Sequence, residues 1–187
     1  MIINVLEYLE NSEKTDPEKV VFGVDNQTIN YSGLVENARK IGTCLINELH
    51  GVRREPIVVF VNRNIESLVS FMAIAYSGNF YVPVDMQMPK MRIELILETL
   101  KPVAAIVLNS DLEYSRRISY NLLTIIYEEA LKYPIQTEKL MAVRRTAIDT
   151  DPIYATFTSG STGIPKGVIT CHRSVIDMTE EIGRAHV

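Results

Sequence analysis

Residues 153–169 read Ile-Tyr-Ala-Thr-Phe-Thr-Ser-Gly-Ser-Thr-Gly-Ile-Pro-Lys-Gly-Val-Ile. The first part, Ile153–Thr158, has the apolar and β-branched composition of a strand. The next part, Thr158–Gly167, holds three glycines, four hydroxyl side chains and one lysine within ten residues. A strand-like pair, Val168-Ile169, follows at once. The segment therefore predicts a strand that ends in a glycine-rich loop and is followed by more extended chain.

The residue types of this loop suit a bound polyphosphate. Glycine permits positive φ and lets backbone N–H groups approach an anion closely, hydroxyl groups donate hydrogen bonds, and Lys166 supplies a full positive charge. The loop is not a Walker A motif, because Gly167 rather than Ser or Thr follows the lysine. A flexible, solvated linker is the other interpretation, but it gives no reason for the pair Pro165-Lys166.

Upstream of the loop, helix-like and strand-like apolar spacings alternate. This alternation predicts an α/β fold in which layered helices surround a mostly parallel sheet. The expected strands are Val20–Val24, Thr28–Asn30, Ile57–Val61, Phe80–Val82, Val103–Leu108 and Leu122–Ile126. The expected helices are one near Leu6–Leu9, one capped by Ser32 and running to Leu49, one over Ile65–Tyr76 and one over Pro89–Leu100. The polar segment Lys132–Asp151 is interpreted as a long connection with room for a short strand.

Composition excludes several classes of function. With 187 residues and a net charge of -4, the chain lacks the concentrated positive field of a nucleic-acid-binding protein. Its longest apolar runs are strand-sized, so we expect no membrane span, and the acidic first ten residues do not resemble a secretory signal. We therefore expect a cytoplasmic protein, with Cys44 and Cys171 as free thiols and no metal site built from cysteine or histidine.

The end of the chain carries a second prediction. A helix is expected to start near His172, with Val175, Ile176 and Thr179 on one side. The last six residues read Ile-Gly-Arg-Ala-His-Val, which matches the translation of a common sequencing adapter. We therefore interpret 182–187 as a non-native tail on a truncated chain, and native coding sequence beyond Glu181 would contradict this interpretation.

The run Tyr154–Gly167 closely resembles the phosphate-loop signature of the adenylate-forming (AMP-binding) superfamily. Two earlier segments agree with it in order. Ile29–Leu34 resembles the family's Thr-Tyr-x-Glu-Leu motif, with Gly33 in place of the glutamate. Tyr76–Asp85 resembles Lys-Ala-Gly-x-Ala-Tyr-Val-Pro-Leu-Asp, with Tyr76-Ser77 in place of Lys-Ala. The resemblance implies that 1–181 form a partial N-terminal AMP-binding domain. This is the N-terminal part of the large domain of an adenylate-forming enzyme, which is truncated here.

The family's chemistry is implied with the resemblance. A carboxylate attacks the α-phosphate of ATP, which gives an acyl-adenylate and pyrophosphate, and a thiol then takes the acyl group. By similarity, ATP with Mg²⁺ would be bound by Thr158, Ser159, Gly160, Ser161, Thr162, Gly163 and Lys166. Lys166 would be catalytic, because it would stabilise the pyrophosphate as it leaves.

The resemblance leans toward one branch of the family. The runs Tyr81–Asp85 and Cys171–Val175 are similar to the adenylation domains of nonribosomal peptide synthetases and to D-alanine–carrier-protein ligase. The implied partners are an amino acid and a phosphopantetheinyl carrier protein. A fatty-acyl or aryl-acid ligase of the same superfamily remains open, as does a non-catalytic nucleotide-binding module. The adenine pocket and the C-terminal lysine follow the loop in this family, so we expect the chain alone to be inactive.

Two further residues have alternative interpretations. Asp85 is read as a turn or cap residue in preference to a metal ligand, because a single carboxylate after a proline has that role most often. His172 is read as a residue that caps or packs at the start of the last helix, in preference to a residue on the substrate side.

Overall fold

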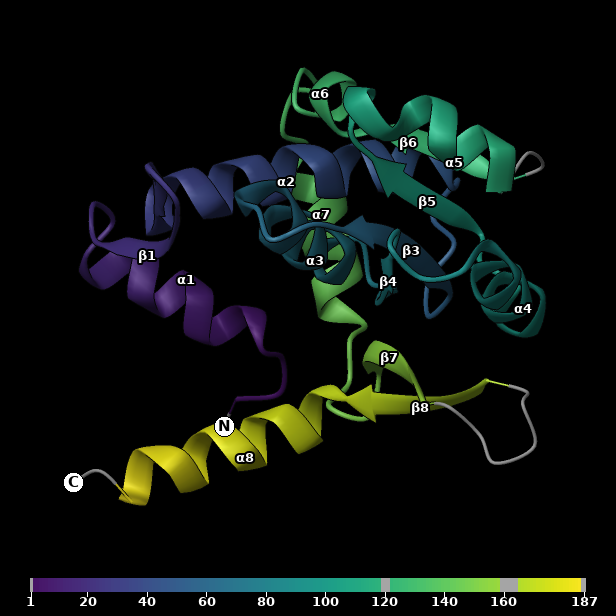
Figure 1. The fold of residues 1–187 in the computed structure, drawn as a ribbon. Helices are drawn as coiled ribbons and strands as arrows, with labels where there is room; N and C mark the ends of the chain where they lie inside the picture. Colours follow the sequence, from purple (N-terminus) through teal and green to yellow (C-terminus); the bar gives the residue numbers. More distant parts are fainter. Residues whose placement is uncertain (1, 119–121, 159–164, 186–187) are drawn as a thin grey trace.

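A computed structural model describes residues 2–118, 122–158 and 165–185. In this part of the chain, six strands form one sheet in the order β6-β5-β3-β4-β7-β8. Their bounds are β3 Pro56–Val61, β4 Phe80–Asp85, β5 Ala104–Val107, β6 Leu123–Ile126, β7 Pro152–Thr158 and β8 Lys166–Cys171. All neighbours are parallel except β7 and β8, which are antiparallel. The predicted α/β fold with a mostly parallel sheet is confirmed (Figure 1).

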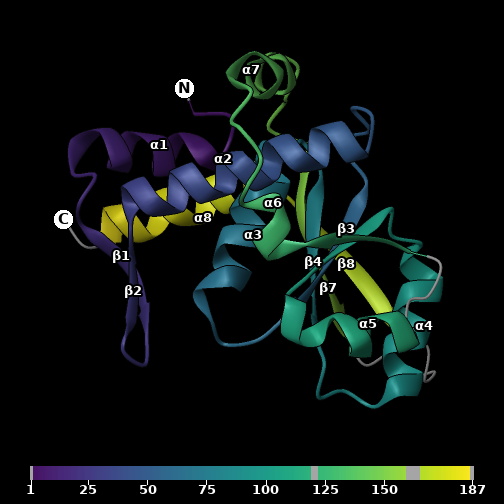
Figure 2. The same ribbon diagram turned by 90° about the horizontal axis from the view of Figure 1, so that it is seen from above.

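Helices cover both faces of the sheet because β3 is apolar on both. Ile57 and Val59 point toward α2 (Tyr31–Glu48) and α3 (Ile65–Tyr76). Val58 and Phe60 point to the opposite face, toward α4 (Lys90–Leu100) and α5 (Leu112–Ile118). Figure 2 shows α4 and α5 on the opposite side of the strands from α2. A strand buried on both faces reads as a continuous apolar run, which is why sequence alone identified β3.

The remaining elements surround this centre. They are α1 (Leu6–Thr15), the antiparallel hairpin of β1 (Val20–Val24) and β2 (Gln27–Asn30), a 3₁₀ turn (Asn109–Asp111), α6 (Tyr127–Ala130), α7 (Thr137–Arg145) and α8 (His172–Ala185). Helices α1 and α8 come from opposite ends of the chain, and α8 lies below α1 in Figure 1. The hydrogen bond from Tyr8 Oη to Glu180 Oε1, at 3.4 Å, joins them. Helix α8 continues through 182–185.

Several boundaries differ from the sequence predictions. Asn30, rather than Ser32, caps α2: its Oδ1 accepts a hydrogen bond from Gly33 N–H at 2.8 Å. Strand β4 runs through Pro83 to Asp85, three residues beyond the predicted end; it pairs with β3 over its whole length, whereas its described ladder with β7 is limited to Tyr81. Asp85 is a turn residue, since its Oδ1 accepts from Gln87 N–H at 2.8 Å. Pro89 precedes the first turn of α4 and does not lie within it.

The largest error concerns 132–151, which contains helix α7 instead of a strand. Only Leu140 of this helix is buried and most of its other residues are polar, so its apolar stripe is short. The short helices α5 and α6 were also missed. The predicted strand over Leu122–Ile126 is present as β6, and its Leu123 is exposed because β6 lies at the edge of the sheet.

Candidate functional site

Strands β7 and β8 bring the two ends of the glycine-rich segment together. Thr158, the last residue of β7, is the cross-strand partner of Lys166, the first residue of β8. Directly opposed residues of an antiparallel pair share a face, so the hydroxyl and the ammonium leave the hairpin on the same side. Both residues are exposed. The other predicted site residues, Ser159, Gly160, Ser161, Thr162 and Gly163, lie outside the described residues.

The two faces of this hairpin differ. The pairs Thr156–Val168 and Thr158–Lys166 share one face, which presents hydroxyl groups and a cation. The pairs Ala155–Ile169 and Phe157–Gly167 share the other face, which is apolar.

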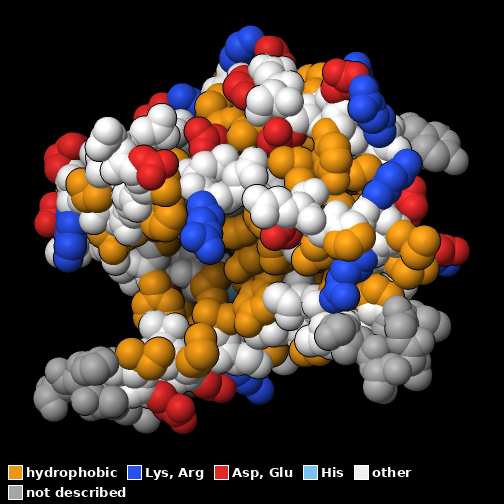
Figure 3. Space-filling view, viewed as in Figure 1, with side chains coloured by type: hydrophobic (Ala, Val, Ile, Leu, Met, Phe, Trp, Pro, Cys, Tyr) orange, Lys and Arg blue, Asp and Glu red, His pale blue; other side chains and the backbone are white. Residues whose placement is uncertain are grey.

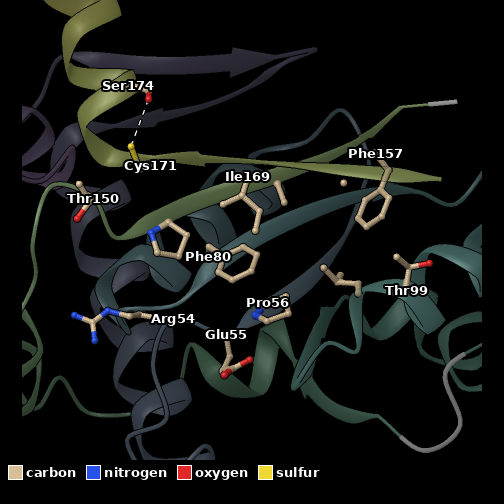
Figure 4. Close-up of a pocket in the computed structure, with 14 residues that line it drawn as sticks. Arg54, Glu55, Pro56, Phe80, Thr99, Thr150, Phe157, Ile169, Cys171 and Ser174 are labelled. Atoms are coloured by element: carbon tan, nitrogen blue, oxygen red, sulfur yellow. Dashed lines mark hydrogen bonds between the residues drawn. The ribbon is translucent and has the colours of Figure 1, made fainter. Parts of the chain in front are cut away.

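A cavity of about 660 Å³ lies against the apolar face. Its lining residues include Arg54, Phe80, Leu100 and Thr150 besides those of the hairpin (Figure 4). Thr158 and Lys166 are not among them. The cavity therefore lies on the opposite face of the hairpin from Thr158 and Lys166.

The hairpin is attached to the parallel sheet through two tyrosines. Tyr154 of β7 is the described ladder partner of Tyr81 of β4. Their rings stack with centroids 5.7 Å apart, and Phe71 of α3 stacks on the other side of Tyr81 at 4.3 Å. Burial, together with Tyr154, raises the pKa of Tyr81 to about 12, so its phenol stays neutral at physiological pH. This aromatic stack holds β7 against β4.

Charged pairs hold the beginning of β7 and of α8. Arg54 Nε donates to Asp151 Oδ1 at 2.6 Å, and Arg173 Nε donates to Asp149 Oδ2 at 2.8 Å. Sequence reasoning missed both pairs, because their partners are far apart in the chain or carry no motif. Asp151 directly precedes β7 and Arg173 lies in the first turn of α8, which follows β8, so the two pairs anchor both strands at the base of the hairpin.

His172 packs at the start of α8. It is buried, and its Nδ1 accepts a hydrogen bond from Val5 N–H at 3.2 Å. Desolvation lowers its pKa to about 4, so the imidazole is neutral over the physiological range. The contact joins α8 to the start of α1, which is the packing role predicted for this residue.

The two cysteines are free. Cys44 is buried in the core, where burial raises its thiol pKa to about 11. Cys171 lies at the end of β8, and a contact with Ser174 Oγ at 3.4 Å lowers its thiol pKa.

The arrangement at the loop suits phosphate chemistry. A hydroxyl group and an ammonium group on one exposed face are donors that fit the oxygens of a polyphosphate. Across the described ranges, no group of three or more His, Cys, Asp or Glu side chains is arranged to hold a metal ion. Among the same residues, no helix is long and apolar enough to cross a membrane.

Comparison with known proteins gives a family and a fold. A family model described as AMP-binding enzyme matches residues 9–186. The D-alanine--D-alanyl carrier protein ligase of Lactiplantibacillus plantarum is 28% identical over 183 residues, which are 96% of this chain and 34% of the ligase. Tyrocidine synthase 1 of Brevibacillus parabrevis is 24% identical over 176 residues, which are 94% of this chain and 16% of the synthase.

Solved structures share the fold. A nonribosomal peptide synthetase, FmoA3, in an α-methyl-L-serine-AMP-bound form superposes with a TM-score of 0.81 at 18% identity, over 97% of this chain and 20% of its own. A fatty acyl-adenylate ligase from L. pneumophila, in complex with acyl adenylate and pyrophosphate, gives 0.76 at 18% identity, over 96% and 32%.

The chain spans about a third of the length of the D-alanine ligase that it matches. Within that span, the family match covers both the parallel sheet and the β7–β8 hairpin with its glycine-rich loop. The chain therefore belongs to the AMP-binding enzyme family.

Proposed function

We propose that this chain supplies the ATP-phosphate site of an adenylate-forming ligase, which activates a carboxylate as an acyl-adenylate and releases pyrophosphate. The observation that carries the proposal is the pairing of Thr158 with Lys166 at the open end of the β7–β8 hairpin. Membership in the AMP-binding enzyme family supports the same chemistry.

In this proposal the loop holds the β- and γ-phosphates of ATP. Thr158, Ser159, Ser161 and Thr162 donate hydroxyl hydrogen bonds, while Gly160 and Gly163 leave backbone N–H groups accessible. Lys166 neutralises the charge that develops on the pyrophosphate as the α-phosphate is attacked. Each hydrogen bond to a charged group contributes about 1.5–3 kcal/mol. Mg²⁺ would enter with ATP, bound to the phosphate oxygens.

We further propose that the carboxylate is an amino acid and that a carrier-protein thiol accepts the acyl group. The support is the similarity to a D-alanine--D-alanyl carrier protein ligase and to tyrocidine synthase 1. The fatty acyl-adenylate ligase shares the fold at 18% identity, so a fatty acid is the alternative substrate class. Amino-acid-dependent ATP–pyrophosphate exchange by the protein with its downstream sequence supports the first, and exchange that depends only on fatty acids would replace it.

The direct experiment is a calorimetric titration of the chain with MgATP. We expect Lys166→Ala to weaken binding about tenfold to a hundredfold, the loss of one hydrogen bond to a charged group. Thr158→Ala should also weaken it. Lys132→Ala is the matched control, because Lys132 pairs with Glu129 on the surface near α6 and not at the hairpin. Equal affinity for the wild type and both loop variants would refute the phosphate site.

Binding and turnover should separate in this chain. The chain corresponds to about a third of the D-alanine ligase, and we propose that the missing groups of the family's active site lie in the rest. The 187-residue chain should therefore bind MgATP without catalysing pyrophosphate exchange. Exchange above background with any amino acid would show that this part of the proposal is wrong.

A further inference from the structure

Phe157 lies directly over Gly167. The two residues are cross-strand partners, so both point to the apolar face of the hairpin. A Cβ atom built on Gly167 would lie 3.1 Å from Cζ and 3.3 Å from Cε1 of the Phe157 ring. Those distances are shorter than ordinary van der Waals contact, so the ring occupies the space that any larger residue would need.

The glycine is required here for close approach and not for backbone freedom. Among the described residues, the glycines with positive φ are Gly51 and Gly78. Gly167 is outside that group, so its backbone would accept an L-residue. Aromatic rings that cover a strand glycine compensate for the contacts that the glycine lacks, which stabilises and pins the register of the pair.

The position of this pair gives the contact its consequence. Thr158–Lys166 is the final pair of the hairpin, where the loop begins and ends, and Phe157–Gly167 is the pair next to it. The ring is half-buried and lies at the cavity, as Figure 4 shows, while Thr158 and Lys166 point away from it. The ring therefore contacts the strands next to the ends of the loop from the face opposite to Thr158 and Lys166.

We propose that Phe157 is a positioning residue of the phosphate loop. Its ring, seated on Gly167, sets the spacing and twist of the two strands at the final pair. That geometry determines where the Thr158 hydroxyl and the Lys166 ammonium stand relative to each other. The ligand in this inference is the polyphosphate of the proposed function, on which it rests.

The cavity makes the proposal testable without unfolding the protein. An alanine at 167 would push the ring away, and the adjacent space of about 660 Å³ can receive it. Gly167→Ala should therefore leave the core intact while it displaces the final pair, Thr158–Lys166. Gly23→Ala is the matched control: Gly23 also lies in a hairpin strand, but its added Cβ would meet Thr28 Cγ2 at an ordinary 3.4 Å.

The experiment is a double-mutant cycle read by the affinity for inorganic tripolyphosphate, below the unfolding temperature of every variant. We expect Gly167→Ala and Phe157→Ala each to weaken binding about fivefold to tenfold, within the range of coupled neighbours. The double variant should bind no more weakly than Phe157→Ala, because the clash disappears with the ring. Phe157→Tyr should restore wild-type affinity, and Gly23→Ala should not change it.

Three results would overturn the inference: wild-type affinity in Gly167→Ala, fully additive losses in the double variant, or no recovery with tyrosine. Failure of the proposed function looks different, because the wild-type chain itself would then bind no tripolyphosphate, and the role of Phe157 in affinity would fall with it. NMR tests the contact separately. The Gly167 α-protons should be shifted upfield by the ring in the wild type and should lose that shift in Phe157→Ala.

Discussion

Individual side chains in this molecule act through few, specific contacts. Lys166 and Thr158 owe their proximity to a single cross-strand pairing, and His172 holds two helices through one acceptor nitrogen. The imidazole is buried and its pKa lies near 4, so folding holds it in the neutral form. The burial that packs His172 therefore also makes the free energy of unfolding depend on pH.

The first prediction concerns the pH dependence of stability. The pKa of His172 is about 4 in the folded chain, against an ordinary value of 6.5. Between pH 4 and pH 6.5, the unfolded chain therefore binds a proton at this residue that the folded chain does not bind. The free energy of unfolding should therefore fall as the pH decreases from about 6.5 to 4, by up to about 3 kcal/mol from this residue.

Urea unfolding at several pH values measures this effect. His172→Asn keeps an acceptor for Val5 N–H but has no titrating ring, so its stability should fall less over the same pH window. The control is His50→Asn, since the exposed His50 makes no such contact. Parallel pH profiles for the wild type and His172→Asn would contradict the prediction.

Secondary-structure elements are fixed at their ends by side chains whose identity is not always evident from sequence. Asn30 ends β2 and at the same time caps α2, so one residue joins two elements. Asn64 caps α3 in the same way, with Oδ1 accepting from Ser67 N–H at 3.1 Å. At the sheet, the stack of Phe71, Tyr81 and Tyr154 joins α3, β4 and β7, and it holds the base of the loop-bearing hairpin.

The second prediction tests which residue caps α2. Asn30→Ala should lower the free energy of unfolding by about 1 kcal/mol, because Gly33 N–H loses its acceptor. Ser32→Ala should have a smaller effect, since Asn30 already accepts the hydrogen bond of the helix terminus. Chemical denaturation of the two variants decides between them, and a larger loss for Ser32→Ala would restore serine as the cap.

The whole molecule combines a well-covered centre with an open side. Helices cover both faces of β3 and β5, while β8 forms an edge of the sheet on which Val168 is 54% and Ile169 is 63% exposed. Figure 3 shows hydrophobic side chains gathered in a hollow below α3 and above α8. An exposed apolar edge strand is a site for association.

The third prediction concerns this edge. Val168→Thr and Ile169→Thr together should reduce the binding of a hydrophobic dye and the self-association of the chain. Both residues keep β-branched side chains, so the strand itself should persist. Analytical ultracentrifugation and dye fluorescence measure the two effects, with Val20→Thr on the exposed part of β1 as the control. Unchanged association would place the responsible surface elsewhere.

Sequence reasoning recovered the elements whose burial leaves a pattern. Strand β3 and helices α2 and α3 were found because they bury apolar residues continuously or at helical spacing. Helix α7 was missed because Leu140 alone is buried among mostly polar residues, and the edge position of β6 could not be predicted because it depends on strand order. For the proposed site, the motif predicts Thr158 and Lys166, and these two stay a prediction. The role proposed for Phe157 rests on the cross-strand register, which the motif does not contain.

We propose that the loop between β7 and β8 receives the triphosphate of ATP. The most direct measurement is an NMR titration of the chain with inorganic tripolyphosphate, followed through the backbone amide shifts. We expect saturable shifts concentrated in Thr158–Gly167, which weaken strongly in Lys166→Ala. Shifts centred on another part of the chain, or saturation unaffected by loss of the lysine, would contradict it.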